Sequence, residues 1–101
     1  MAHMGLQSYV DLAKTGTKDS VETIMAHLNR GITIAESKFI DYALGRVETE
    51  AGTDVIMHYL FHGTQIQRNY CTLYFGRRGE YLIVRKAFDA GLIDAKQAFS
   101  R

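Results

Sequence analysis

Two histidines four residues apart are the first candidates for chemistry in this chain. His58 and His62 would share one face of a helix, where their imidazole nitrogens could hold a metal ion between them. The glutamate that acts as the base in helical zinc-protease motifs is missing, because Tyr59 and Leu60 stand in its place. The spacing supplies no third ligand, so we predict no metal site and keep the pair as a weak candidate.

The single cysteine offers a second reactive group. One cysteine excludes an internal disulfide and a cysteine-based zinc site. Cys71 occupies the position that Val10 and Ile40 hold in two related segments, which indicates a small buried side chain instead of a nucleophile.

Two further patterns could suggest an enzyme. Residues 76–79, Gly-Arg-Arg-Gly, lack the spacing and the lysine of phosphate-binding loops, and are better interpreted as a turn between helices. Glu48 and Glu50 fall in a polar segment, 47–52, that we expect to be a solvated loop, where acid–base catalysis lacks rigid placement. We therefore predict a protein that is not an enzyme and needs no cofactor.

Length and composition indicate one folded domain. The chain has 101 residues, of which 47% are hydrophobic and 23% charged, so it is too apolar for intrinsic disorder. Residues 1–4 (Met-Ala-His-Met) are typical of a cloning remnant, and we expect the domain to span residues 5–101. No apolar run long enough to cross a bilayer and no signal peptide are visible, which predicts an intracellular, cytoplasmic protein without a membrane segment.

The elements that position these residues are marked by glycines, since proline is absent. Gly31, Gly63 and Gly91 each close a stretch with apolar side chains seven and three positions earlier, which places those side chains on one helix face. We expect each glycine to end a helix by adopting the left-handed conformation. Asp19 or Ser20 and Thr53 are the predicted N-caps of the first two of these helices.

A second pattern, an aromatic residue opening a short apolar segment, precedes each of these stretches. It begins at Tyr9, Phe39 and Tyr70, and Phe99 follows at a similar interval. Self-similarity at such a period is typical of stacked repeats. We predict an all-α solenoid of three helical hairpins, with units near 9–38, 39–69 and 70–98, and a partial C-terminal cap helix. The expected helices are 6–14, 19–30, 36–46, 53–61, 66–76 and 80–89.

The stretch 72–91 resembles an ankyrin repeat, including Gly79 ahead of the second helix and Gly91 after it. Residues 54–63 are similar to the second helix of that family. The usual Thr-Pro-Leu-His opening is missing, and the period is slightly shorter than that of ankyrin repeats, so other helical-pair stackings fit the same pattern.

The resemblance implies a protein–protein adaptor or inhibitor that binds its partner through loops and first-helix surfaces. Arginine and aromatic residues, the usual interface anchors, are densest in the first helix of the third unit. The predicted partner-binding residues are Thr33, Glu36, Lys38, Gln65, Gln67, Arg68, Tyr74, Arg77, Arg78, Asp94 and Lys96. We expect Tyr70 and Phe75 in the core.

Charge distribution supports an alternative partner. Residues 64–101 carry seven basic and three acidic side chains, while residues 5–63 carry five and eight. A basic, tyrosine-rich C-terminal third is compatible with a nucleic-acid-binding helical module, although this charge is modest for such proteins. The chain also ends soon after the fourth unit begins, so we expect an open apolar face that could bind a second copy, with candidates Phe88, Leu92, Ile93 and Phe99.

Overall fold

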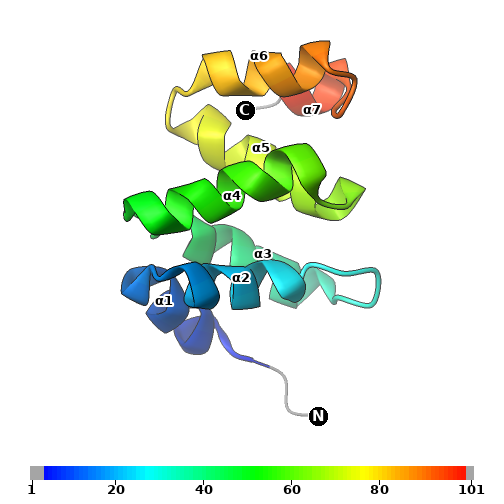
Figure 1. Cartoon of the computed structure of the whole chain (residues 1–101). Coiled ribbons are helices and arrows are strands. Elements are labelled where there is room, and N and C mark those ends of the chain that lie inside the picture. Colours follow the sequence, from blue (N-terminus) through cyan, green and yellow to red (C-terminus); the bar gives the residue numbers. More distant parts are fainter. Residues whose placement is uncertain (1–3, 100–101) are drawn as a thin grey trace. The chain divides into compact units, whose positions relative to one another are not determined.

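The computed structural model describes residues 4–99, which form seven α-helices and no strand (Figure 1). The predicted all-α class is therefore confirmed. The six expected helices match α1 to α6 within three residues, except that α2 ends four residues early. The helices are α1 (Leu6–Thr15), α2 (Lys18–Ala26), α3 (Ile34–Leu44), α4 (Glu50–His62), α5 (Gln65–Arg77), α6 (Tyr81–Asp89) and α7 (Ala95–Phe99).

Between residues 4 and 99, none of the helices has both the length and the hydropathy needed to cross a bilayer.

The chain divides inside α4, between Ile56 and Met57, into two units.

The first unit is built around α1, which packs against both α2 and α3 (blue to green in Figure 1). Tyr9, Val10 and Ala13 are buried on one face of α1, with the one- and four-residue spacing of a helix stripe. Buried residues of the next elements complete this core: Val21, Ile24, Met25, Leu28, Ile40, Ala43, Leu44, Val47, Val55 and Ile56.

The turn between α1 and α2 is fixed by Gly16 and Thr49. Gly16 ends α1 at φ +66°, and its carbonyl accepts a hydrogen bond of 2.6 Å from the Thr49 hydroxyl. The same Thr49 oxygen accepts from the backbone N–H of Gly52 at 3.0 Å, at the start of α4. One side chain therefore connects the α1–α2 turn to the first turn of α4.

Two of the expected N-caps and one expected loop are wrong. Thr17, and not Asp19 or Ser20, caps α2 by accepting from the Ser20 backbone N–H at 3.2 Å. Thr53 lies inside α4, because the helix begins at Glu50. The segment 47–52 is not a solvated loop throughout, since Val47 is fully buried and Gly52 is buried within the helix.

The second unit packs α5 against α6 and α7, and α6 against α7 (yellow to red in Figure 1). Phe75 is buried, as expected, whereas Tyr70 is only half-buried. The remaining buried apolar residues of this unit are Leu60, Cys71, Tyr74, Val84, Ala87 and Ile93.

Glycines in the left-handed conformation follow α5 and α6. Gly79 (φ +73°) and Gly91 (φ +76°) terminate these two helices. After each glycine, the next residue donates back across the helix end, as in the Leu92 N–H to Ala87 carbonyl bond of 3.0 Å. The prediction is thus confirmed for Gly91.

The same prediction is wrong for Gly31 and Gly63, neither of which has positive φ. Gly31 lies beyond the end of α2 and is separated from it by a turn. Gly63 follows α4 directly, and a Cβ there would lie 2.6 Å from the Tyr59 carbonyl oxygen. Glycine is needed at position 63 for this close approach to backbone instead of for its φ.

Candidate partner-binding surface

Several predicted partner-binding residues are helix caps. The Thr33 hydroxyl accepts from the Glu36 backbone N–H at 3.1 Å at the start of α3. In front of α5, Thr64 and Gln67 form a reciprocal capping box, with bonds of 3.2 and 2.8 Å. Thr33 and Gln67 therefore have local structural roles that the sequence interpretation did not assign.

Asp94 has a similar role at α7. Its carboxylate accepts from the Gln97 backbone N–H at 2.8 Å, and the Gln97 side chain accepts from the Asp94 N–H at 2.9 Å. Lys96 on the same helix is exposed, as are Lys38 on α3 and Gln65 at the start of α5. These three remain available to a partner.

Glu36 is engaged with the core instead of with solvent. Its Oε2 accepts from the hydroxyl of the fully buried Tyr9 at 2.5 Å. Burial raises the pKa of the Tyr9 phenol, and the hydrogen bond and negative charge of Glu36 raise it further. His27 packs edge-on against the Tyr9 ring at 5.6 Å and donates through Nδ1 to the Thr23 carbonyl at 2.8 Å, at the end of α2.

The arginine–tyrosine cluster of α5 is only partly on the surface. Tyr74, predicted to bind a partner, is 3% exposed and belongs to the core, which corrects that prediction. The guanidinium of Arg78 lies 4.3 Å from the Tyr74 ring centroid and is exposed, as is Arg77. Arg68 is half-buried, and its Nε has no hydrogen-bond partner in the described part of the chain.

The four expected self-association residues do not form one open face. Ile93 is 4% exposed and part of the core of the second unit, because α7 packs on α5 and α6. Phe88 is half-buried, with its ring 5.5 Å from the ring of Phe99, and Leu92 is also half-buried. Phe99 alone among the four is exposed, at 57%.

The two histidines of α4 and the single cysteine are the side chains with the greatest potential for chemistry. The rings of His58 and His62 lie 4.8 Å apart on an exposed part of α4. No group of three or more potential ligands is present among residues 4–99. Cys71 is a buried free thiol, and burial raises its pKa, so it stays protonated at neutral pH as expected for a small core residue.

The exposed face of α6 was missed by the sequence interpretation. Val84 and Ala87 are buried three residues apart, which turns the opposite side of the helix outward. Leu82 lies on that side and is 89% exposed, the most exposed large hydrophobic residue among those described. Tyr81 beside it is also exposed. The sequence spacing could have indicated this exposure, because Leu82 is two residues from Val84 and therefore does not share the buried face of α6.

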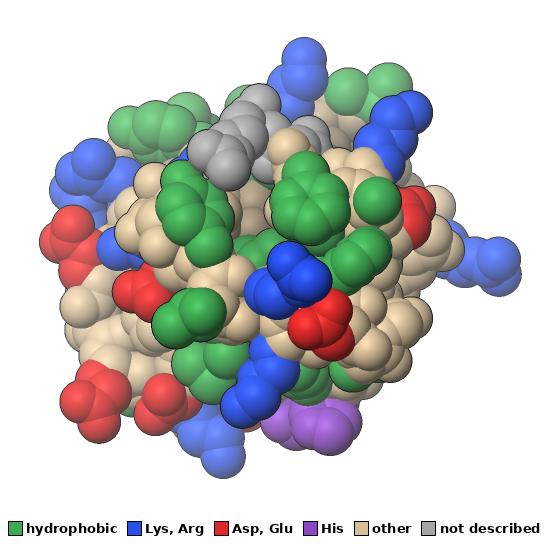
Figure 2. All heavy atoms as spheres, turned by 90° about the horizontal axis from the view of Figure 1, so that it is seen from above, with side chains coloured by type: hydrophobic (Ala, Val, Ile, Leu, Met, Phe, Trp, Pro, Cys, Tyr) green, Lys and Arg blue, Asp and Glu red, His purple; other side chains and the backbone are tan. Residues whose placement is uncertain are grey.

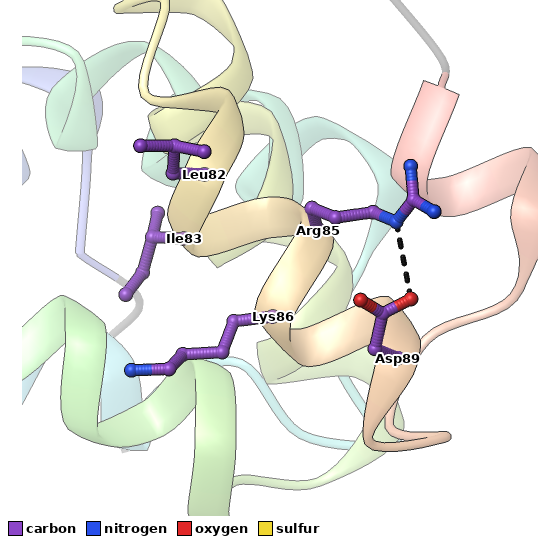
Figure 3. Close-up of a pocket in the computed structure, with 5 residues that line it drawn as sticks. All are labelled: Leu82, Ile83, Arg85, Lys86 and Asp89. Carbon is purple, nitrogen blue, oxygen red and sulfur yellow. Dashed lines mark hydrogen bonds and ion pairs between the residues drawn. The ribbon is translucent and has the colours of Figure 1, made fainter.

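A shallow hollow of about 350 Å³ runs along this face, and we call it the α6 surface (Figure 3). Arg85 and Asp89 point to one side of the helix, where Arg85 Nε and Asp89 Oδ1 form an exposed ion pair of 3.1 Å. The Lys86 side chain extends to the other side, near Ile83. The residues that line the hollow are Leu82, Ile83, Arg85, Lys86 and Asp89.

Figure 2 shows one face of the molecule as spheres, coloured by side-chain type. Near the middle of this view, hydrophobic side chains lie next to basic and acidic ones. Residues 77–89 carry four basic and two acidic side chains, so the region around the α6 surface has a positive balance. A mixture of exposed apolar and basic groups is suited to binding and offers no reactive constellation.

Comparison with known proteins finds no relative: no protein-family model, no curated protein and no solved structure matches the chain.

Proposed function

We propose that the chain is a small, non-catalytic protein–protein interaction module, an adaptor or inhibitor, built as a short helical-hairpin solenoid that resembles ankyrin repeats. The observation that carries the proposal is the exposure of Leu82. Leu82 is aliphatic and 89% exposed, and it lies beside Tyr81 and a hollow lined by Ile83. Covering this apolar surface with a partner removes it from water, which stabilises the complex.

Repeated packing relationships support the solenoid. In the first unit α1 packs on its hairpin partner α2 and on the next first helix, α3; in the second unit α5 packs in the same way on α6 and α7. The caps follow the same period, because Thr33, Thr64 and Asp94 precede α3, α5 and α7 at nearly equal intervals along the chain. Repeat proteins of this kind commonly act as binding scaffolds.

We place this function in the cytoplasm. Cys71 is a free thiol, and unpaired cysteines are usual in reducing compartments. This part of the proposal is checked by fluorescence microscopy of the tagged chain in its native cell.

A pull-down from native lysate tests the function. The tagged chain is compared with Leu82→Ser, and with Ile34→Ser as the matched control, because Ile34 is a 78% exposed aliphatic residue in the first unit. We expect a nuclease-resistant protein band at fixed stoichiometry with the unchanged chain and Ile34→Ser, and loss of that band with Leu82→Ser.

The alternative, nucleic-acid binding, predicts a different result. Protein bands would disappear after nuclease treatment, absorbance at 260 nm would be recovered, and binding would weaken steeply as salt rises because counterions are released. That outcome would replace the proposal. The burial of Tyr74 favours the protein partner, since a buried ring is not available to stack on bases.

A further inference from the structure

We infer that the α6 surface binds an acidic amphipathic helix of a partner protein, a conclusion that rests on the proposed function and specifies the partner. The described residues contain no strand, and so no free strand edge on which an extended peptide could pair. From Val84 onward, the backbone N–H groups of α6 donate within the helix. Recognition must therefore use side chains, as when an amphipathic helix occupies a groove.

The dimensions of the surface suit a short helical segment. α6 has nine residues, so it offers a length of about 13 Å at about 1.5 Å per residue. A partner helix lying along it can present two apolar side chains three or four positions apart. The hollow of about 350 Å³ is open along α6, which favours protruding side chains of another chain over an enclosed small molecule.

The charged side chains around α6 favour a negatively charged partner. Lys86 has no ion-pair partner among the described residues, whereas Arg85 is paired with Asp89. A carboxylate on the rim of the partner helix would provide Lys86 with an opposite charge, and a lysine there would be repelled. The four basic and two acidic side chains of residues 77–89 extend the same preference.

The same observations disfavour a nucleic acid on this surface. Leu82 and Ile83 offer aliphatic groups that a phosphate backbone cannot use. An apolar face flanked by Asp and Glu satisfies both the aliphatic and the basic parts of the surface.

A peptide-display selection against the full chain tests the inference. A library of random peptides, each long enough to form several helical turns, is enriched for binders, and the composition of enriched and starting pools is compared. We expect enriched peptides to carry an excess of Asp and Glu, with Leu, Ile or Phe three or four positions apart. The best peptide is then synthesised with a fluorophore and titrated by anisotropy.

Four variants locate the binding. We expect Leu82→Ser to weaken the peptide by about tenfold or more, as an exposed anchor would. Lys86→Glu should weaken it by about tenfold at low salt and less at high salt. Ile34→Ser and Lys18→Glu, matched exposed residues of the first unit that belong to no candidate site, should leave the affinity within about twofold. Circular dichroism of every variant shows whether the helices are retained.

Other outcomes overturn the inference in distinguishable ways. Enriched peptides without an acidic excess, or binding that Leu82→Ser and Lys86→Glu do not change, would contradict the inference and leave the proposed function intact. An equal loss with Lys18→Glu would move the site to the first unit. Absence of any enriched peptide would also contradict it, and the lysate pull-down then decides the proposed function separately. Binding of a labelled oligothymidine that is insensitive to Leu82→Ser would favour a nucleic acid.

Discussion

The hydroxyl of Tyr9 donates a 2.5 Å hydrogen bond to Oε2 of Glu36, which connects the middle of α1 to the first turn of α3. The two residues are 27 positions apart, so the bond stabilises tertiary packing instead of a single helix. Tyr9 is fully buried, and His27 from the end of α2 packs against its ring. Tyr9 therefore connects α1 both to α3 and to the C-cap of α2.

Removing the hydroxyl should destabilise the protein. We expect Tyr9→Phe to lower the free energy of unfolding by about 1–2 kcal/mol, because the bond involves a carboxylate and is partly buried. Urea denaturation measures the change. Tyr42→Phe is the control: Tyr42 is an exposed tyrosine of α3, and its substitution should cost less than about 0.5 kcal/mol. Equal effects of the two substitutions would contradict the role of the Tyr9 bond.

Alkaline pH should weaken the same region. The pKa of Tyr9 is raised in the folded state, chiefly by burial, so above a pH of about 10 the unfolded chain loses this proton while the folded chain keeps it. The unfolded state then binds fewer protons, and the free energy of unfolding falls as pH rises, by at most about 1.4 kcal/mol per pH unit from this group. Urea denaturation between pH 9 and 11.5 measures the slope, which Tyr9→Phe should reduce. An unchanged slope in that variant would show that other groups dominate.

A side chain at Gly16 should be poorly tolerated. A Cβ there would lie 2.5 Å from Thr49 Cγ2, in addition to the strain of φ +66°. Gly91 has a similar φ of +76° but open space around it, so Gly91→Ala isolates the backbone strain, about 1–2 kcal/mol. We expect Gly16→Ala to cost about 1–3 kcal/mol more than Gly91→Ala in thermal or urea unfolding.

Substitution of Thr49 tests whether the collision with its side chain destabilises Gly16→Ala. Thr49→Ala loses the two hydrogen bonds of this hydroxyl and should destabilise the unchanged protein, but it should cost less in the Gly16→Ala background, where it also removes the collision. A double-mutant cycle detects this difference as coupling between the two positions. Strictly additive effects would show that the collision is relieved in another way.

The capping box in front of α5 should contribute to stability. We expect Thr64→Ala to lower the free energy of unfolding by about 1 kcal/mol, because the Gln67 backbone N–H loses its acceptor. Ser8→Ala, at an exposed position inside α1, serves as the control and should be close to neutral. Denaturant titration of both variants measures the difference, and similar values would contradict the capping role.

Ile93 and Leu82 should respond in opposite ways to truncation. Ile93→Ala removes a buried side chain and should cost about 2–5 kcal/mol, whereas Leu82→Ala should change stability by less than about 0.5 kcal/mol. Thermal unfolding measures both. A neutral Ile93→Ala would return this residue to the surface that the sequence interpretation assigned to it.

The helices and their order follow from the sequence because their determinants are local. Apolar residues four apart and a glycine such as Gly91 define a helix face and a helix end within a few residues of each other. The two capping boxes could also have been predicted from the sequence, because each has the spacing that defines the motif. The pairs are Thr64 with Gln67 and Asp94 with Gln97. The sequence interpretation instead assigned Gln67 and Asp94 to partner binding.

The candidate surface could not be predicted in the same way. Tyr74 and Leu82 are both apolar residues of helices, yet Tyr74 is 3% exposed and Leu82 is 89% exposed. Periodicity determines which residues share a face, but the neighbouring helices decide which face is covered, and those contacts join segments distant in sequence. The sequence alone thus determined the all-α class, the approximate helix limits and the buried character of Cys71. Only the tertiary structure decided the Tyr9–Glu36 bond, the burial of Ile93 and the exposure of the α6 surface, because each depends on which elements pack together.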